Sequence, residues 1–311
     1  MLAVGCLISL GVSAQVFQKV GTGLSPAGTI YSQVMIEDNG NIYAGYSTYL
    51  RQGQTYINNS FVERWDGLAW HKYPALVDKQ ITDIAIFQND VYVSAFDINN
   101  GYNGNVFKFD GTAWNPVFTG ITGSVSKLAV LNGNLAAAGG FTHTGTGQHN
   151  LIGYDGTSTT TYPPLHVNDS ISDMRVINGE LWVTGRFGGS INNDTSSIKR
   201  LSGGLWKYPA IAHKPSVGWS YCYMVFQYNN KIYSVDNGKL YEVRNDTAHY
   251  VANSHAYTGA ESGGNMYLSH GADLFLFNGT TVSTVVGAPY GVGALTSSTA
   301  GLFGMFRDTS K

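Results

Sequence analysis

The feature that most constrains the fold of this chain is a unit of about 40 residues that recurs along it. The first copy, VMIEDNGNIYAGYSTYLRQGQTYINNSFVERWDGLAW at 34–70, holds apolar runs separated by Asn39-Gly40, a polar stretch and Asp66-Gly67. Later copies begin with ITDIAIFQND at 81, VSKLAVLNGN at 125 and ISDMRVINGE at 171. Because short strands and frequent turns repeat at this spacing, the pattern predicts the blades of a β-propeller.

The turns and the strands between them support four short strands in each unit. Asn-Gly and Asp-Gly favour two-residue hairpin turns, since both central residues of a type I′ turn need a positive φ. Strands such as LAVLNGNLAAAGGF at 128–141 are apolar at nearly every position. A strand that is covered on both faces needs this pattern, whereas a sheet with one wet face would alternate. Trp70, Trp114 and Trp206 follow the second turn and are expected to fill the wedge between blades.

The fold class that we predict is all-β, a single β-propeller of four-stranded blades. Six blade repeats lie near 32–74, 81–118, 125–162, 171–209, 221–250 and 256–286. A last blade takes two strands from 292–311 and a fourth strand from 16–20, which leaves its third strand missing. Pairing of the N- and C-terminal strands would then close a propeller of seven blades and leave no sheet edge.

The start of the chain has features of an exported protein. Leu2–Val12 is apolar and Val12-Ser13-Ala14 offers small residues for cleavage, so residues 1–14 are predicted to be a signal peptide, although no Lys or Arg precedes the apolar run. We therefore expect a secreted, cell-surface or periplasmic protein. Cys222 would be the one cysteine left after cleavage, which excludes a disulfide framework and predicts a small buried thiol.

Composition argues against several classes of partner. Charged residues make up 12% of the chain and the net charge is −2, so no basic field attracts nucleic acid or an anionic membrane. The longest apolar run is too short to span a bilayer as a helix. We expect a monomeric propeller.

The repeat also resembles a known family. The motif is carried by IYAGY…FVERWDGLAW, VYVSAF…NVFKFDGTAW and LAAAGGF…NLIGYDGTS, which are similar to repeats of secreted bacterial Kelch-like and galactose-oxidase-like propellers. Gly139-Gly140 matches the Kelch glycine doublet. The resemblance covers nearly all of the mature chain and implies a propeller, but a fold analogy does not transfer a catalytic site.

Long connections lie on one side of each predicted blade, while the Asn-Gly and Asp-Gly turns lie on the other. The long loops are predicted at 47–60, 97–104, 142–148, 162–170, 188–196 and 208–220. Because ligands are usually met by long loops on a rigid scaffold, this is the expected working face. Its candidate ligand-binding residues, whose aromatic members could stack on sugar rings or on a protein, are Tyr49, Arg51, Tyr56, Asp97, Tyr102, His143, His166, Arg186, His213 and Trp219.

The sequence shows no nucleophile elbow, phosphate loop, paired carboxylate or zinc-type histidine spacing, so no catalytic or metal-ligating residue is predicted. Asp97–Asn105 is rich in oxygen ligands and glycine and could hold Ca²⁺, although it lacks EF-hand spacing. Asp66, Asp110 and Asp155 are interpreted as turn formers.

The function that we favour is a non-catalytic binding or adhesion scaffold for glycan or protein on the long-loop face. Two alternatives stay open. A secreted carbohydrate-active enzyme, a hydrolase or lyase, would need an acidic or histidine pair that converges on the same face. A structural repeat module of a larger surface protein would need no ligand.

Overall fold

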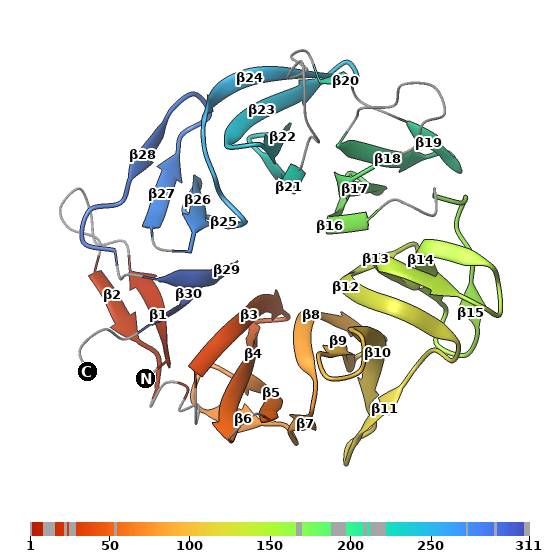
Figure 1. Cartoon of the computed structure of the whole chain (residues 1–311). Helices are drawn as coiled ribbons and strands as arrows, with labels where there is room; N and C mark the ends of the chain where they lie inside the picture. Colours follow the sequence, from red (N-terminus) through yellow and green to blue (C-terminus); the bar gives the residue numbers. More distant parts are fainter. Residues whose placement is uncertain are drawn as a thin grey trace. The chain divides into compact units, whose positions relative to one another are not determined.

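The computed structural model describes residues 2–8, 16–21, 24, 29–52, 55–165, 170–187, 197–207, 210–211, 222–271, 273–288 and 291–307. Within these ranges every regular element is a β-strand (Figure 1), which confirms the all-β class. The same ranges hold no helix long and apolar enough to cross a membrane. The chain forms two compact units, one of Met1–Ile84 with Ala256–Lys311 and one of Ala85–His255.

Six sheets are propeller blades in which four strands that follow one another in the sequence pair in antiparallel order. The first two blades consist of β3 (Thr29–Asp38), β4 (Asn41–Gln52), β5 (Thr55–Trp65) and β6 (Trp70–Lys72), and of β8 (Gln80–Phe87), β9 (Asp90–Asp97), β10 (Asn103–Phe109) and β11 (Trp114–Pro116). The next two consist of β12 (Ile121–Leu131), β13 (Asn134–His143), β14 (Gln148–Tyr154) and β15 (Thr159–Thr160), and of β16 (Ser170–Ile177), β17 (Glu180–Arg186), β18 (Ile198–Ser202) and β19 (Leu205–Lys207). The last two consist of β21 (Cys222–Tyr228), β22 (Lys231–Asp236), β23 (Lys239–Arg244) and β24 (Thr247–Asn253), and of β25 (Thr258–Ser262), β26 (Asn265–His270), β27 (Asp273–Phe277) and β28 (Val282–Thr284). Two short strands extend these blades: β7 (Leu76–Val77) pairs with β5, and β20 (Ala210–Ile211) pairs in parallel with β24.

One further sheet joins the two ends of the chain, in the order β2-β1-β30-β29. Its strands are β1 (Leu2–Ile8), β2 (Val16–Lys19), β29 (Val292–Ser298) and β30 (Gly301–Arg307). The predicted pairing of terminal strands is therefore confirmed. The predicted count of seven blades is wrong, because six sheets are blades of consecutive strands and this sheet is assembled from two separate segments.

The third strand of the terminal sheet, which we expected to be missing, is β1. It pairs with β30 through Leu7↔Leu302 and with β2 through Leu7↔Phe17. These residues lie within the predicted signal peptide, so cleavage after Ala14 would remove this strand from the sheet. The signal peptide stays a prediction. A mature protein from which it has been cleaved would lack the pairing of β1 with β2 and β30.

The two kinds of turn differ from each other. The Asn-Gly turns are two-residue hairpins with both residues at positive φ, as predicted: Asn39 and Gly40 lie at 49° and 82°, Asn132 and Gly133 at 50° and 75°, and Asn178 and Gly179 at 52° and 76°. The Asp-Gly turns are four residues long, so our two-residue interpretation is wrong for them. Their aspartate accepts two backbone N–H groups instead: at Asp66 both distances, from Leu68 and Ala69, are 2.8 Å.

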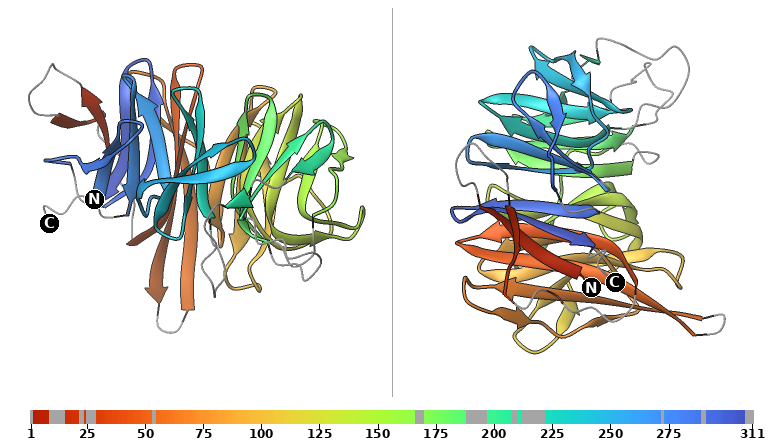
Figure 2. Two further views of the ribbon diagram at one scale, coloured as in Figure 1. Left: turned by 90° about the horizontal axis from the view of Figure 1, so that it is seen from above. Right: turned by 90° about the vertical axis from the view of Figure 1, so that its left-hand side faces the viewer.

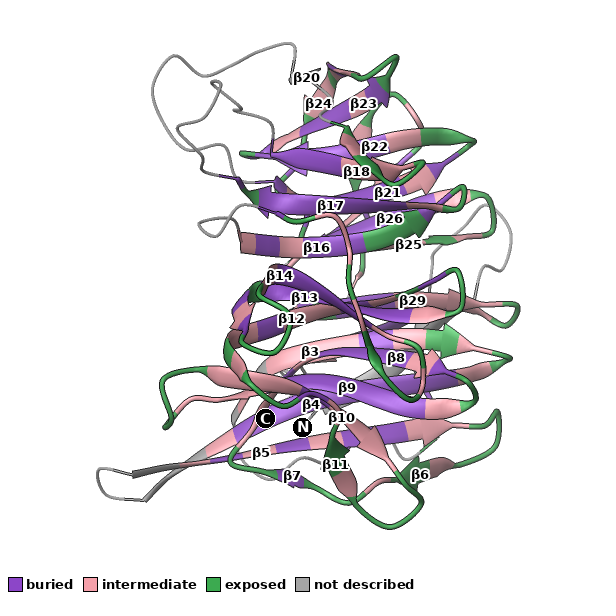
Figure 3. Ribbon diagram, turned by 90° about the vertical axis from the view of Figure 1, so that its right-hand side faces the viewer, coloured by how far each residue is buried: buried purple, intermediate pink, exposed green. Residues whose placement is uncertain are grey.

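Within each unit, successive sheets pack face to face through continuous apolar clusters. In the first unit Met35 and Tyr46 pack with Phe303 and Met305. In the second unit the β8–β11 and β12–β15 sheets share a cluster that includes Phe87, Val106, Leu135, Ile152 and Phe118. The middle strands carry most of the buried residues (Figure 3), which is what sheets covered on both faces require.

Hydroxyl groups connect neighbouring sheets. Each bond runs from a serine to a backbone carbonyl of the next sheet: Ser32 to Ile81 (2.6 Å), Ser126 to Ile171 (2.9 Å), Ser172 to Cys222 (2.6 Å) and Ser269 to Val292 (2.5 Å). Such bonds satisfy buried backbone oxygens that strand pairing leaves unused. The Cys222 thiol is free and fully buried, as predicted.

Two of the three recurring tryptophans occupy the predicted wedge. The indole Nε1 of Trp70 donates to the carbonyl of Val20 at 3.2 Å, and that of Trp206 donates to the carbonyl of Pro163 at 2.9 Å. Both rings therefore tie one sheet to the chain that leaves the preceding sheet. Trp114 packs against Phe109 within its own sheet, at 5.3 Å between ring centroids.

Candidate functional site

The most unusual element is the hairpin of β4 and β5, which we predicted to be a polar loop at 47–60. That prediction is wrong, since the two strands pair without a break from Ile42↔Trp65 to Gln52↔Thr55. Figure 2 shows both strands running on together past the other strands of their sheet. Strand β3 pairs with β4 only as far as Tyr49, so Leu50–Gln52 adds about 10 Å of two-stranded ribbon at ~3.3 Å per residue.

The base of this hairpin is fixed to β8 on one face. The Ser60 hydroxyl donates to the carbonyl of Lys79 at 2.7 Å, so Ser47, 2.7 Å away, donates to Ser60. Both hydroxyl oxygens also accept the backbone N–H of Ile81 at 2.9 Å. Because all three residues are fully buried, these bonds hold the register of the hairpin.

The opposite face of the base is held by a buried tyrosine and a carboxylate. The Tyr46 hydroxyl donates to Glu63 Oε1 at 2.6 Å, and its ring packs against Phe61 at 5.4 Å. Burial, followed by the bond to Glu63, raises the pKa of Tyr46 well above its usual range, so the hydroxyl stays a donor. Lys72 lies 3.9 Å from the Glu63 carboxylate and 4.7 Å from the centre of the Phe61 ring.

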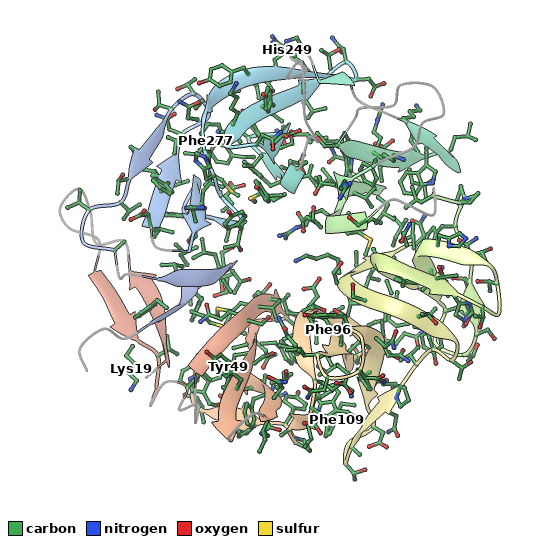
Figure 4. All side chains as sticks on the ribbon, viewed as in Figure 1. Lys19, Tyr49, Phe96, Phe109, His249 and Phe277 are labelled. Carbon is green, nitrogen blue, oxygen red and sulfur yellow. The ribbon has the colours of Figure 1, made fainter. Side chains whose placement is uncertain are left out.

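The ribbon beyond this base brings together three of the candidate residues. Tyr49 (labelled in Figure 4) pairs directly with Asn58, and Arg51 pairs with Tyr56. Directly paired residues and alternate residues of a strand share a face, so Tyr49, Arg51 and Tyr56 lie on one face. For Arg51 and Tyr56 this placement comes from backbone register alone. We call this surface the ribbon face.

The reverse side of the ribbon has a different chemistry. Leu50 pairs with Ile57 there, so two aliphatic residues lie opposite the aromatic and cationic ones. Arg51 is also the only Lys, Arg, Asp or Glu between Asp38 and Glu63. By backbone register, one face of the ribbon therefore carries Tyr49, Arg51, Tyr56 and Asn58, and the other carries Leu50, Gln52, Thr55 and Ile57.

Asp97 and Tyr102 lie in a different element, the turn that joins β9 to β10. Asp97 Oδ1 accepts the N–H of Asn99 at 2.9 Å, and the Asp97 carbonyl accepts the N–H of Tyr102 at 3.0 Å. Tyr102 has a φ of 60°, is 58% exposed and packs on Phe96 at 5.6 Å between ring centroids. A bulky residue in the left-handed region is uncommon, so Tyr102 stays a candidate contact residue.

The Asp97–Asn105 segment is a strand end and a short turn, where we expected a loop. The amide oxygen of Asn105 accepts the N–H of Val106 at 2.8 Å and that of Phe118 at 3.2 Å, and its nitrogen donates to the Phe118 carbonyl at 2.6 Å. Asn103 Oδ1 accepts the N–H of Gly123 at 3.1 Å. These side chains tie β10 to the chain that follows it. The Ca²⁺ site stays a prediction.

His143 supports the turn between β13 and β14. Its Nδ1 accepts the backbone N–H of Thr146 at 3.1 Å and lies 2.8 Å from the Thr146 hydroxyl, while its ring meets Phe118 edge-on at 6.4 Å. Since a backbone N–H can only donate, Nδ1 carries no proton in this arrangement. The imidazole is 5% exposed and is engaged in its own turn.

The other candidates are dispersed. Arg186 is exposed at the end of β17, where its backbone pairs with Ser170. His166, His213 and Trp219 lie outside the described residues. Among the described candidates, the structure therefore groups Tyr49, Arg51 and Tyr56 on one element, and places Asp97 with Tyr102 on another.

The aspartates of the Asp-Gly turns are confirmed as turn formers. Asp110 Oδ1 accepts the N–H groups of Thr112 and Ala113, both at 2.8 Å, and Asp155 does the same with Thr157 and Ser158. These backbone donors, Ala113 first, hold the pKa of the Asp110 carboxyl well below its usual range. The low pKa reflects turn geometry and carries no catalytic meaning.

Sequence reasoning missed three residues of the ribbon: Leu50, Ile57 and Asn58. A signal for them was present, since Gln52-Gly53-Gln54 offers a turn with flanking segments of equal length that can pair about it. The segment contains too many polar residues to show the continuous apolar pattern of the other strands, so periodicity did not predict it.

Comparison with known proteins supports the fold. No family model matches the chain and no curated protein matches it. Among solved structures, the extracellular domain of BT4673, described as a hybrid two-component system of B. thetaiotaomicron, is 12% identical with a TM-score of 0.62, over 99% of this chain and 40% of that chain. PorZ, a surface component of the type-IX secretion system of Porphyromonas gingivalis, is 14% identical with a TM-score of 0.58, over 94% of this chain and 48% of that chain.

An enzyme is similar as well. An acylaminoacyl peptidase of Pyrococcus horikoshii is 9% identical with a TM-score of 0.50, over 87% of this chain and 48% of that chain. The chain thus spans less than half the length of each of these three proteins. At such identities the likeness establishes the β-propeller fold, whose members differ widely in function. The Kelch-like family is not shown.

Proposed function

We propose that this protein is an exported, non-catalytic binding scaffold whose β4–β5 ribbon contacts a glycan or protein ligand. The observation that carries the proposal is the ribbon face, on which the backbone register places Tyr49, at the end of the pairing with β3, beside Arg51 and Tyr56, which lie beyond it. Tyrosine and arginine are the residue types most often responsible for affinity at binding surfaces. The buried base keeps the ribbon in a fixed register, which lowers the entropy lost on binding.

Two further observations support this proposal. Extracellular and surface domains of bacterial proteins occur among the similar structures, which agrees with action outside the cytoplasm. The enzyme alternative needs an acid–base pair on the long-loop side, and two of its candidates, Asp97 and His143, each bond to backbone N–H groups of their own turns.

The proposal is tested by binding of the purified chain to a glycan array and to intact cells of the producing species. We expect binding that falls at least tenfold in the double variant Arg51→Ala/Tyr56→Ala. Tyr250→Ala, which removes an exposed tyrosine of β24 that is not a candidate contact residue, is the matched control and should bind like the wild type. Binding that is absent, or equally strong in the double variant, would overturn the proposal.

A further inference from the structure

The terminal sheet differs from the six blades in the origin of its third strand. In each blade the third strand follows the second along the chain, whereas in the terminal sheet the place between β30 and β2 is taken by β1 from the start of the chain. β1 pairs with β30 over six residue pairs and with β2 over four. Both edges of β1 are therefore used by its neighbours.

The predicted cleavage after Ala14 would remove β1 and leave a place one strand wide between β30 and β2, which we call the slot. Neighbouring strands lie about 4.8 Å apart, so β30 and β2 are about 10 Å from each other. Alternate residues of an antiparallel pair direct both backbone groups to the partner, so about six N–H and C=O groups of residues 302–307 would lose their bonds. Residues 301–306 include no charge and no proline, the usual means by which proteins protect such an edge.

The wall of the slot that β30 forms is held without help from β1. β30 pairs with β29 along its length. Phe303 and Met305 are buried on one face in the cluster that includes Met35, and Leu302 is buried on the other face with Leu295. This wall should therefore keep its place when β1 is removed.

The other wall is held by the residues that follow β2. Val20 is buried, and its carbonyl accepts the indole N–H of Trp70 at 3.2 Å. The chain then passes so close to Trp65 that a Cβ at Gly21 would lie 2.8 Å from its ring. Because β2 and β30 are both antiparallel to β1, they run parallel to each other. To replace β1, β2 would have to leave this anchor and pair in parallel, so we expect the slot to stay open.

We infer that, after removal of residues 1–14, the slot takes up an extended apolar segment of a partner polypeptide, antiparallel to β30. The inference goes beyond the proposed function: it rests on the export that this proposal includes and on the predicted cleavage, and it does not depend on the ribbon. The structure shows the chemistry that the slot accepts, because β1 is an uncharged strand of seven residues, LAVGCLI, without proline.

A polypeptide is favoured by the lining of the slot. Backbone N–H and C=O groups alternate along both walls at the spacing of a strand, and another main chain matches them on both sides. Directly paired residues share a face, so side chains opposite Phe303 and Met305 lie on the face of one apolar cluster and those opposite Leu302 on the face of the other. The occupant therefore needs apolar residues on both of its faces, as a strand covered on both sides does.

The start of the exported chain is determined first, by mass spectrometry of the intact purified protein. We expect it to begin at Gln15. A chain that keeps residues 2–8 fills the slot itself, and this result would overturn the inference.

Hydrogen exchange then tests the uptake of a strand. The probe is a synthetic peptide with the sequence of residues 2–8, extended by two lysines at each end for solubility. We expect it to slow amide exchange at least tenfold in residues 302–307 and in residues 16–19 of the exported chain, because these segments are the two walls. The matched control is the same peptide with Gly5→Pro, which lacks a central N–H and should leave both segments unchanged.

The other results of this experiment contradict the inference. Exchange that the peptide does not change, whether slow or fast, would show that the slot is closed or takes up no strand. Equal protection by both peptides would show adhesion without strand pairing, and protection of residues 302–307 alone would show an added edge strand. Arg51→Ala/Tyr56→Ala should take up the peptide like the wild type, so failure of the ribbon in the cell-binding assay and failure of the slot are separate results.

Photo-crosslinking identifies the partner. Benzoylphenylalanine replaces Lys19, which is exposed at the end of β2, in the exported chain on cells of the producing species. We expect a crosslink to a polypeptide beside an uncharged run of at least six residues without proline, and we expect the peptide, but not its Gly5→Pro form, to prevent it. Absence of a crosslink, a crosslink to a charged segment, or one that the peptide does not prevent would overturn the assignment of a partner polypeptide.

Discussion

The β4–β5 and β9–β10 hairpins occupy the same place in two neighbouring repeats and are built in opposite ways. The polar side chains of the β9–β10 hairpin are engaged by the fold: Asp97 accepts the N–H of Asn99 in its own turn, and Asn105 of β10 bonds to Phe118 after β11. The β4–β5 hairpin concentrates its bonds at the base, around Ser47, Ser60 and Tyr46, and then continues as a ribbon. The same blade plan therefore holds both a closed turn and a projecting strand pair.

Because of this difference, we expect substitutions in one hairpin to change the stability of the fold and substitutions in the other to change ligand binding. In the closed turn the polar side chains are engaged by the fold, so substitutions there should change stability. In the projecting hairpin the bonds described above lie at the base, so we expect substitutions beyond Tyr49 to change binding and leave stability intact. These expectations are tested by substitutions at the base and at the tip of the projecting hairpin and by a substitution in the closed hairpin.

The largest loss of stability is expected at the base of the projecting hairpin. Tyr46→Ala removes a fully buried ring and leaves the buried Glu63 carboxylate without its hydroxyl donor. We expect a loss of about 4 kcal/mol in the free energy of unfolding, measured by denaturant titration. Tyr46→Phe keeps the ring and should lose about 1–3 kcal/mol. A loss below about 1 kcal/mol for Tyr46→Ala would show that the base is not the anchor.

A smaller loss is expected in the closed hairpin. Asn105→Ala leaves the backbone N–H and the carbonyl of Phe118 without their side-chain partner, and Phe118 itself is buried. We expect about 2 kcal/mol by the same titration, since unsatisfied buried groups cost about 1–3 kcal/mol. Asn105→Asp keeps the acceptor and loses the donor, so it should fall between wild type and Asn105→Ala. Equal stability of all three would contradict a structural role for this side chain.

The blade plan could be predicted from sequence because it depends on local chemistry. The turns at Asn39-Gly40 and its repeats require positive φ, and the residue types Asn and Gly predict this conformation. The Asp-Gly turns were placed correctly but given the wrong length, since Asp66 bonds to N–H groups two and three residues ahead, and a dipeptide motif does not show this. The third strand of the terminal sheet was missed because Leu2–Ile8 has the composition of a signal peptide.

The candidate site was predicted only in part. Tyr49, Arg51 and Tyr56 were chosen as aromatic and basic loop residues, but their common face depends on a register that begins at Ile42↔Trp65. A one-residue slip would place Tyr49 and Tyr56 on opposite faces, and composition does not distinguish the two registers. His143 could not be assigned from sequence, because its bond to Thr146 follows from the geometry of the turn.

The Asp-Gly turns should make the stability of the fold depend on pH. Asp110 has its pKa lowered by backbone donors, so its ionised form stabilises the folded state above about pH 4, the usual pKa of an aspartate. This contribution should be lost as the pH falls below that value, because protonation removes the negative acceptor. The melting temperature of Asp110→Asn, whose amide oxygen accepts the same bonds without titrating, should fall less between pH 6 and pH 3. Parallel curves for wild type and variant would contradict the assignment.

The smallest effect on stability is expected at the tip of the ribbon. Arg51 and Tyr56 lie beyond the residues of the hairpin that pair with β3 and β7. We therefore expect Arg51→Ala/Tyr56→Ala to change the free energy of unfolding by less than about 0.5 kcal/mol. The same variant is the one expected to lose ligand binding, which sets it apart from Asn105→Ala, whose effect should be on stability alone. Both variants are compared by denaturant titration and by the cell-binding assay. If the tip variant unfolds as easily as Asn105→Ala, the ribbon is part of the structural framework and the contrast between the two hairpins fails.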